Sequence, residues 1–281
     1  MIYEHEIPSK SRLYFAKSAQ KKREIEQHAS EVLYKENYDE IVTPFFSYHQ
    51  HQTIDEKSLI RYADTQNHIL SMRADSTLDV VRIITKRLGR SVAQKKWFYI
   101  QPVFRYPSSE QYQIGAEYLG NDDLSVSIND SAKIIQKLDL NPLLQISNIN
   151  IPRILSEKFN LNLDVFKNAN LEEIFKLDIA WLSKLASLQH ISQIEEVIEE
   201  VPESIKSELT KIKDLCDNIS YENIAIAPLF YTKMRYYDNL FFRYFENNNT
   251  LGMGGNYCYE KIDSTGFALY TDNLIEELLE A

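Results

Sequence analysis

Apolar and polar residues follow two periods along the chain, one typical of helices and one typical of strands. Between residues 11 and 36, apolar residues recur at helical intervals and predict an amphipathic helix that ends near Asn37. The same period predicts helices over residues 76–88 and 272–279. Runs rich in β-branched and aromatic residues predict short strands over residues 40–46, 69–72, 97–104, 112–119, 224–231 and 239–245. Pro44 suits a strand at an edge or an interface.

The middle of the chain has a different composition. Residues 151–218 contain no glycine, and Leu and Ile recur there at helical intervals with Glu and Lys between them. We interpret this stretch as a helical insertion. The sequence therefore predicts an α+β fold, in which an antiparallel sheet flanked by helices is formed by residues 1–150 and 219–281 and is interrupted by the insertion.

Composition excludes several classes of protein. The chain of 281 residues is 44% hydrophobic and 26% charged, which is typical of a globular protein with a sizeable core. Its net charge of −10 argues against an extended nucleic-acid surface, because such surfaces need many cations. Cys216 and Cys258 lack the spacing of a disulfide framework or a zinc site. The sequence has no apolar leader and no apolar run of membrane length, so we expect a cytoplasmic protein that binds no membrane. We also expect it to need no metal and no cofactor.

The seven glycines are unevenly placed. Six of them lie in two short segments, QIGAEYLG (residues 113–120) and the stretch from LGMGGNY to TGFAL (residues 251–269). Clustered glycines favour a site, although bulges and turns of a sheet explain any single one equally well. Neither segment has the spacing of a P-loop or of a dinucleotide-binding turn.

Several segments of the sequence resemble the motifs of a known family, and they occur in the same order and at similar spacing. The segments are NYDEIVTP (37–44), MRADSTLDVVR (72–82), YIQPVFRY to QIGAEYLG (99–120), MRYYDNLFF (234–242), GMGGNY (252–257) and TGFAL (265–269). They resemble, in that order, motif 1, the amino-acid-binding segment, motif 2, the two histidine segments and the start of motif 3 in the histidyl branch of class II aminoacyl-tRNA synthetases. That branch includes a non-catalytic paralogue, the regulatory subunit of ATP phosphoribosyltransferase, and RADST with QIGAE is more similar to this paralogue.

The resemblance implies a histidine-binding site. Its expected residues are Asp75 and Thr77 for the α-ammonium group, Gln113 for the main-chain polar end, and Glu117, Tyr236 and Tyr237 for the imidazole. Gln113 and Glu117 are four apart on a predicted strand and so point to one face. Asp75 equally suits a helix cap, and the tyrosines equally suit a core.

Departures from the synthetase pattern bear on activity. In motif 2, Tyr106 and Pro107 follow Arg105 in place of a Glu and an ATP-handling loop. Asn273 stands where motif 3 has an arginine, and Thr232 stands where the histidyl enzymes have another arginine. Losing several charge-assisted contacts should remove adenylation, so we predict no aminoacylation. Arg105 and Arg235 remain candidate contacts for an anion or a carboxylate. No anticodon-binding segment is recognisable after residue 269.

Three functions are compatible with these residues. The leading hypothesis is a non-catalytic, histidine-sensing regulatory subunit that partners the catalytic subunit of ATP phosphoribosyltransferase and, by resemblance, forms a homodimer through motif 1. The second is a reduced synthetase-like enzyme that activates an amino acid without charging tRNA. The third is a stand-alone amino-acid-binding scaffold.

Overall fold

The computed structural model of the 281-residue chain describes residues 6–48, 54–89, 91–232 and 236–280. The chain forms two compact units. The first unit consists of Met1–Leu119 and Ala268–Ala281, and the second consists of Gly120–Phe267.

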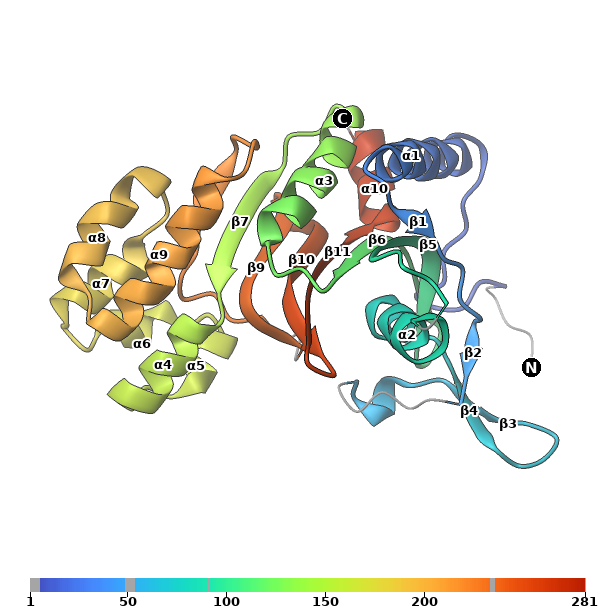
Figure 1. The fold of residues 1–281 in the computed structure, drawn as a ribbon, viewed down its shortest axis with the longest axis horizontal. Coiled ribbons are helices and arrows are strands. Elements are labelled where there is room, and N and C mark those ends of the chain that lie inside the picture. The colour runs from blue at the N-terminus through green and yellow to red at the C-terminus, as the bar shows by residue number, and fades with distance from the viewer. Residues whose placement is uncertain (1–5, 49–53, 90, 233–235, 281) are drawn as a thin grey trace. The chain divides into compact units, whose positions relative to one another are not determined.

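The first unit is built on a long antiparallel hairpin and its flanking helices. Its elements are α1 (Ala16–Lys35), β1 (Asp39–Glu40), β2 (Phe46–Ser47), the 3-10 turn Glu56–Ser58, β3 (Arg61–Ala63), β4 (Ile69–Met72), α2 (Ser76–Ile83), the π-helical turn Ile84–Leu88, β5 (Lys96–Arg105), β6 (Ser109–Leu119) and α10 (Thr271–Glu280). Ile25, Ala29 and Leu33 of α1 are buried, as their spacing predicted. α1 packs against α10 and β6 (Figure 1).

The strand predicted over residues 40–46 is wrong in its extent. Residues 39 and 40 form β1, which pairs in parallel with β5, whereas β2 belongs to a separate three-stranded sheet of order β2-β4-β3. Pro44 has no N–H to donate, and the carbonyl of Thr43 accepts from the guanidinium of Arg73 instead of from a strand. The chain therefore leaves one sheet before it enters the other.

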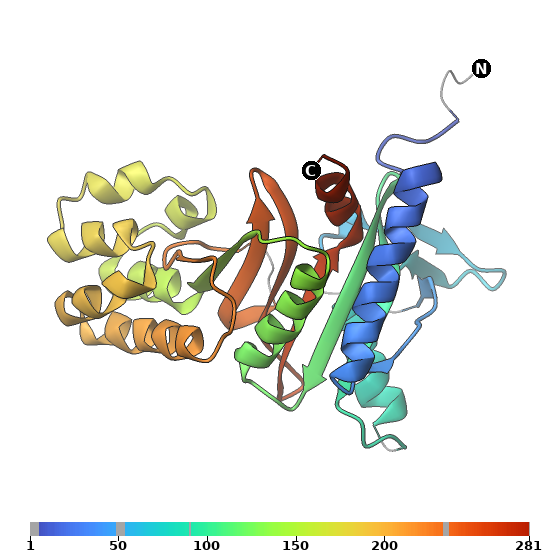
Figure 2. The same cartoon turned by 90° about the horizontal axis from the view of Figure 1, so that it is seen from above.

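The second unit contains the remaining strands and the insertion. Its elements are α3 (Leu124–Lys137), β7 (Leu143–Asn148), α4 (Asn150–Phe159), α5 (Leu163–Lys167), α6 (Leu171–Phe175), α7 (Ala180–Ser187), the 3-10 turn Ile191–Gln193, α8 (Ile194–Glu200), α9 (Glu203–Asp217), β8 (Ile224–Ile226), β9 (Tyr237–Glu246), β10 (Asn249–Tyr259) and β11 (Ile262–Tyr270), which continues into the first unit. Its strand order is β11-β10-β9-β7-β8, in which β9 pairs antiparallel with β10 and with β7, and β7 pairs parallel with β8. α3 packs against β9 and β10 (Figure 2).

The predicted insertion is helical, and its independence as a domain stays a prediction. Helices α4 to α9 gather beside β7, against which α9 packs (Figure 1). The strand predicted over residues 224–231 ends early, at Ile226, because Pro228 cannot continue a ladder of hydrogen bonds. Both units confirm the predicted class, an α+β fold with a mostly antiparallel sheet flanked by helices. In the described ranges, no helix is long and apolar enough to cross a membrane.

Candidate functional site

The β5–β6 hairpin places the predicted motif 2 residues. Its register runs without a break from Lys96 opposite Tyr118 to Arg105 opposite Ser109. Side chains two or four positions apart on such a strand share a face, so Gln113 and Glu117 lie on the same side, as predicted. Glu117 is 1% exposed, which makes it one of the most deeply buried carboxyl groups of the first unit.

Tyr99 links two of the predicted ligand residues, and sequence reasoning missed it. Its hydroxyl lies 3.1 Å from Thr77 Oγ1 and 3.3 Å from Glu117 Oε1. The ring is fully buried on the face that also carries Glu117, since Tyr99 pairs with Gly115. The structure thus brings Thr77 and Glu117 together through one phenol.

Gly115 is required by this arrangement. A Cβ atom at position 115 would lie 2.1 Å from Cζ of Tyr99, far inside the contact distance of two carbon atoms. The physical role of Gly115 is therefore to admit the ring of Tyr99, and the link between the clustered glycines and a ligand site stays a prediction.

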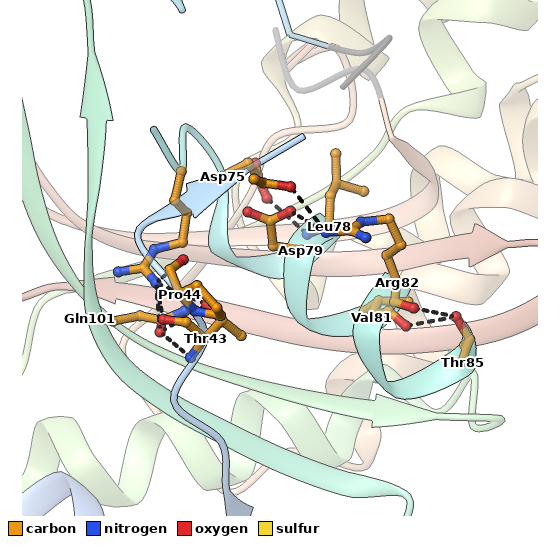
Figure 3. A network of polar contacts seen from close by, with 11 residues as sticks. Thr43, Pro44, Asp75, Leu78, Asp79, Val81, Arg82, Thr85 and Gln101 are labelled. Carbon is orange, nitrogen blue, oxygen red and sulfur yellow. Dashed lines mark hydrogen bonds and ion pairs between the residues drawn. The ribbon is translucent and has the colours of Figure 1, made fainter. Parts of the chain in front are cut away.

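Asp75 begins α2 as its N-cap. Its Oδ1 accepts a hydrogen bond from the backbone N–H of Leu78 at 3.0 Å, and the carboxyl group is 8% exposed (Figure 3). The capping role that the sequence allowed is confirmed. A role of Asp75 in binding an ammonium group stays a prediction.

Arg73 holds the start of α2 in place from within the core. Its Nη1 donates to Thr43 O at 2.9 Å, to Thr43 Oγ1 at 2.8 Å and to Gln101 Oε1 at 3.0 Å, and its Nε donates to Pro102 O at 2.8 Å. Figure 3 shows Thr43, Pro44 and Gln101 gathered on one side of α2. Arg73 is 1% exposed, and burial lowers the pKa of its guanidinium to about 10 despite the nearby charge of Asp79.

The hydrogen bonds of Arg73 go to neutral oxygen atoms. Within the described ranges its side chain forms no ion pair within 4 Å, and its Nη2 and Gln101 Nε2 are buried without a hydrogen-bond partner. Neither residue was singled out from the sequence, because the partners of their side chains lie between 28 and 58 positions away along the chain.

Two of the residues that the sequence singled out, Arg105 and Asn273, line one pocket of the first unit. Arg105 at the end of β5 and Asn273 at the start of α10 line a cavity of about 350 Å³. The structure therefore brings together the two positions that the resemblance placed in motifs 2 and 3. Arg105 is exposed.

The predicted tyrosines belong to the second unit. The rings of Tyr236 and Tyr237 lie 4.8 Å apart, and Tyr237, 4% exposed, stacks on Phe241. A Cβ atom at Gly255 would lie 2.7 Å from the Tyr237 ring. Tyr237 is thus a core aromatic of its unit, and ligand binding by either tyrosine stays a prediction. Arg235 lies outside the described residues.

In the ranges that the structure covers, no group of three His, Cys, Asp or Glu residues is arranged to hold a metal ion. Cys216 and Cys258 are free thiols, and burial raises the pKa of Cys216 to about 12.

The chain is similar to proteins of a known family over most of its length. The family described as histidyl-tRNA synthetase matches residues 14–274. The ATP phosphoribosyltransferase regulatory subunit of Wolinella succinogenes is 45% identical over 99% of this chain and 98% of its own, and that of Helicobacter hepaticus is 41% identical over 99% and 100%. A solved structure from Bacillus halodurans, titled ATP phosphoribosyltransferase regulatory subunit/histidyl-tRNA synthetase, superposes with a TM-score of 0.81 and 21% identity, covering 99% of this chain and 84% of that one.

Proposed function

Because the chain belongs to the histidyl-tRNA synthetase family, and within it to the regulatory subunits of ATP phosphoribosyltransferase, we propose that it senses histidine on behalf of that enzyme. As a regulatory subunit it acts in histidine biosynthesis on a catalytic partner subunit and is not itself the catalyst. The reduced enzyme and the stand-alone scaffold are set aside on the same ground.

The ligand proposed is free histidine, and one observation carries the proposal. The buried chain Thr77–Tyr99–Glu117 combines hydroxyl groups, which donate and accept, with a carboxyl group. An imidazole and an ammonium group need such partners. Asp75 and Gln113 add a carboxylate and a carboxamide on the same unit.

Two further sets of residues stay proposed ligand contacts. Tyr236 and Tyr237 stay proposed contacts for the imidazole. Arg105 and Arg235 stay proposed partners for a carboxylate or another anion.

In the proposed regulation, histidine has different affinities for two arrangements of the complex with the catalytic subunit. Histidine can inhibit the catalytic partner only if it binds one arrangement of the complex more tightly than another.

Titration calorimetry with histidine tests the proposal. Glu117→Gln should weaken binding about tenfold or more, since a hydrogen bond to a charged group contributes roughly 1.5–3 kcal/mol. Glu157→Gln, an exposed carboxylate of α4, is the matched control and should leave the affinity unchanged. Equal affinity in wild type and Glu117→Gln would contradict the proposed site.

A second assay tests regulation itself. The complex with the catalytic subunit should lose histidine sensitivity in Glu117→Gln and keep it in Glu157→Gln. Sensitivity that is unaltered by Glu117→Gln would place the inhibitory site elsewhere.

We also propose a homodimer that covers the chain after β1. Val42, Phe45 and Phe46 are 75%, 49% and 54% exposed, and apolar side chains clustered in this way are typical of an interface. Phe46→Glu should shift sedimentation equilibrium towards the monomer. An unchanged dimer would exclude this surface.

The proposed location is the cytoplasm. Its support is the pair of free thiols, Cys216 and Cys258.

A further inference from the structure

Arg243 lies in β9 directly opposite Gln145 of the neighbouring strand β7 (Figure 1). Nε and Nη2 of Arg243 donate to Gln145 Oε1 at 3.1 and 2.7 Å. Gln145 Nε2 in turn donates to Ser147 Oγ at 3.2 Å, which keeps the amide oxygen turned towards the arginine. One edge of the guanidinium is therefore fixed by the sheet.

Two aromatic rings pack against this guanidinium. Its Cζ lies 4.1 Å from the centre of the Phe230 ring and 4.8 Å from the centre of the Phe245 ring. A cation near the face of a ring is attracted by the quadrupole of the ring, more strongly where water is excluded. Burial lowers the pKa of Arg243, and among the described residues no ion pair links it to a carboxylate. The rings and Gln145 therefore hold this side chain.

Phe230 belongs to the segment that follows β8. The backbone N–H of Ala227 donates to Ile146 O of β7 at 2.9 Å, and the backbone N–H of Phe230 donates to Ala227 O at 3.1 Å. The segment thus starts from a fixed point on the sheet and turns at once. Phe230 is held by this turn through its backbone and by Arg243 through its ring.

A row of ring contacts leads from Phe230 to the two tyrosines proposed as imidazole contacts. The centres of the Phe230 and Phe241 rings lie 5.8 Å apart. Phe241 stacks on Tyr237 with centres 6.1 Å apart and planes 8° apart, and Tyr236 lies 4.8 Å from Tyr237. Phe230 and Tyr236 both pack against the buried cluster that contains Tyr237 and Phe241. Because side chains packed in this way cannot shift singly, the place of Phe230 constrains both tyrosines.

The type of residue at position 243 matters for this contact. A lysine keeps the charge, but its single ammonium group cannot present a flat face to a ring and two N–H groups to one oxygen atom. A methionine fills much of the same volume, but it leaves Gln145 Oε1, on a side chain that is 7% exposed, without its donor. Arginine meets both demands.

We propose that Arg243 is a positioning residue for Tyr236 and Tyr237, because it holds Phe230 against Phe241 and so fixes the two phenol rings. Arg243 acts through these rings and not on the ligand. The inference rests on the proposed function, since it presupposes that the two tyrosines contact histidine.

Titration calorimetry of the full chain with histidine tests the inference in two backgrounds. With both tyrosines present, Arg243→Met should weaken histidine binding about threefold or more, and Arg243→Lys should weaken it less. In the background Tyr236→Phe with Tyr237→Phe, Arg243→Met should have almost no further effect, because the hydroxyl groups that it positions are gone. Lys158→Met, which removes an exposed cation of α4 in the same unit, is the matched control and should leave the affinity unchanged in both backgrounds.

Two results would overturn the inference while histidine binding itself stands. One is equal affinity in wild type and Arg243→Met. The other is the same loss of affinity in both backgrounds, which would show that Arg243 supports the fold in general and not the tyrosines. A wild-type protein that binds no histidine would contradict the proposed function, and this inference with it.

Urea unfolding of every variant keeps lost affinity distinct from lost folding. Each titration is made at a temperature at which the variant is fully folded. If Arg243→Met does not fold, Arg243→Lys carries the same comparison between the two backgrounds, and an effect that is equal in both would again overturn the inference.

Discussion

Removing the hydroxyl of Tyr99 is the sharpest test of the proposed histidine site. Tyr99→Phe keeps the ring, which is fully buried and lies against Gly115. The change deletes only the oxygen atom that lies 3.1 Å from Thr77 Oγ1 and 3.3 Å from Glu117 Oε1. Packing is thereby held constant while the polar link is broken.

The expected loss of stability can be worked from these two contacts. A neutral hydrogen bond contributes roughly 0.5–1.5 kcal/mol and one to a charged group roughly 1.5–3 kcal/mol. Both distances exceed the usual upper limit of about 3.0 Å for O–H···O bonds, so each contact should contribute near the lower limit of its energy range. We therefore expect Tyr99→Phe to lower the free energy of unfolding by about 2 kcal/mol.

Urea unfolding measures the stability, and titration calorimetry measures the histidine affinity. The urea concentration at the midpoint of unfolding should fall, while the dependence of the unfolding free energy on urea concentration, which reports the surface exposed on unfolding, should not change. Histidine affinity should fall several-fold, because Thr77 and Glu117 lose the group that orients them. Tyr259→Phe, at the half-buried end of β10, is the matched control and should stay within about 0.5 kcal/mol of wild type. Unchanged stability and affinity in Tyr99→Phe would refute the link.

Three further outcomes are expected. Arg73→Met should lower the free energy of unfolding by about 3 kcal/mol in urea, more than Arg73→Lys does, because it leaves buried oxygen atoms such as Thr43 O unpaired. Burial raises the pKa of Asp272 above its ordinary 3.8. Proton binding by Asp272 therefore stabilises the folded state fully below pH 3.8, and this stabilisation is lost as the pH rises through the raised pKa. The difference in melting temperature between wild type and Asp272→Asn should therefore depend on pH in that range. A thiol reagent should modify exposed Cys258 in the native protein and Cys216, whose pKa is about 12, only after unfolding.

Much of the fold could be predicted because its signals are local. The helical period located α1, α2 and α10, and the composition of residues 151–218 predicted the helices α4 to α9. The errors occur at Pro44 and after Ile226, where a proline follows β-branched residues. β-Branched residues have a high strand propensity, but a proline has no backbone N–H, so the hydrogen bonds between strands end there.

The candidate site was only partly predictable, for a different reason. Two residues on one strand, Gln113 and Glu117, share a face by the period of the strand alone, so their placement needed no tertiary information. Tyr99 and Arg73 act through residues on other elements, and nothing local distinguishes them from ordinary core residues. The one available signal was Gly115, a glycine within a strand, which indicates that a large group approaches the backbone.

Arg73 contacts both the proposed dimer surface after β1 and the start of α2, where the proposed histidine site lies. The exposed residues Val42 and Phe45 flank Thr43, and Thr43 is bound directly to the guanidinium of Arg73. Arg73 also donates its backbone N–H to Phe45 O at 2.8 Å and lies two residues before Asp75. A subunit that docks on Val42 and Phe45 and moves Thr43 must therefore move Arg73 or break these hydrogen bonds, and both change the start of α2. If docking and histidine binding are coupled, Arg73→Lys should weaken the coupling more than it weakens either binding step, since a single ammonium group cannot reach all these acceptors.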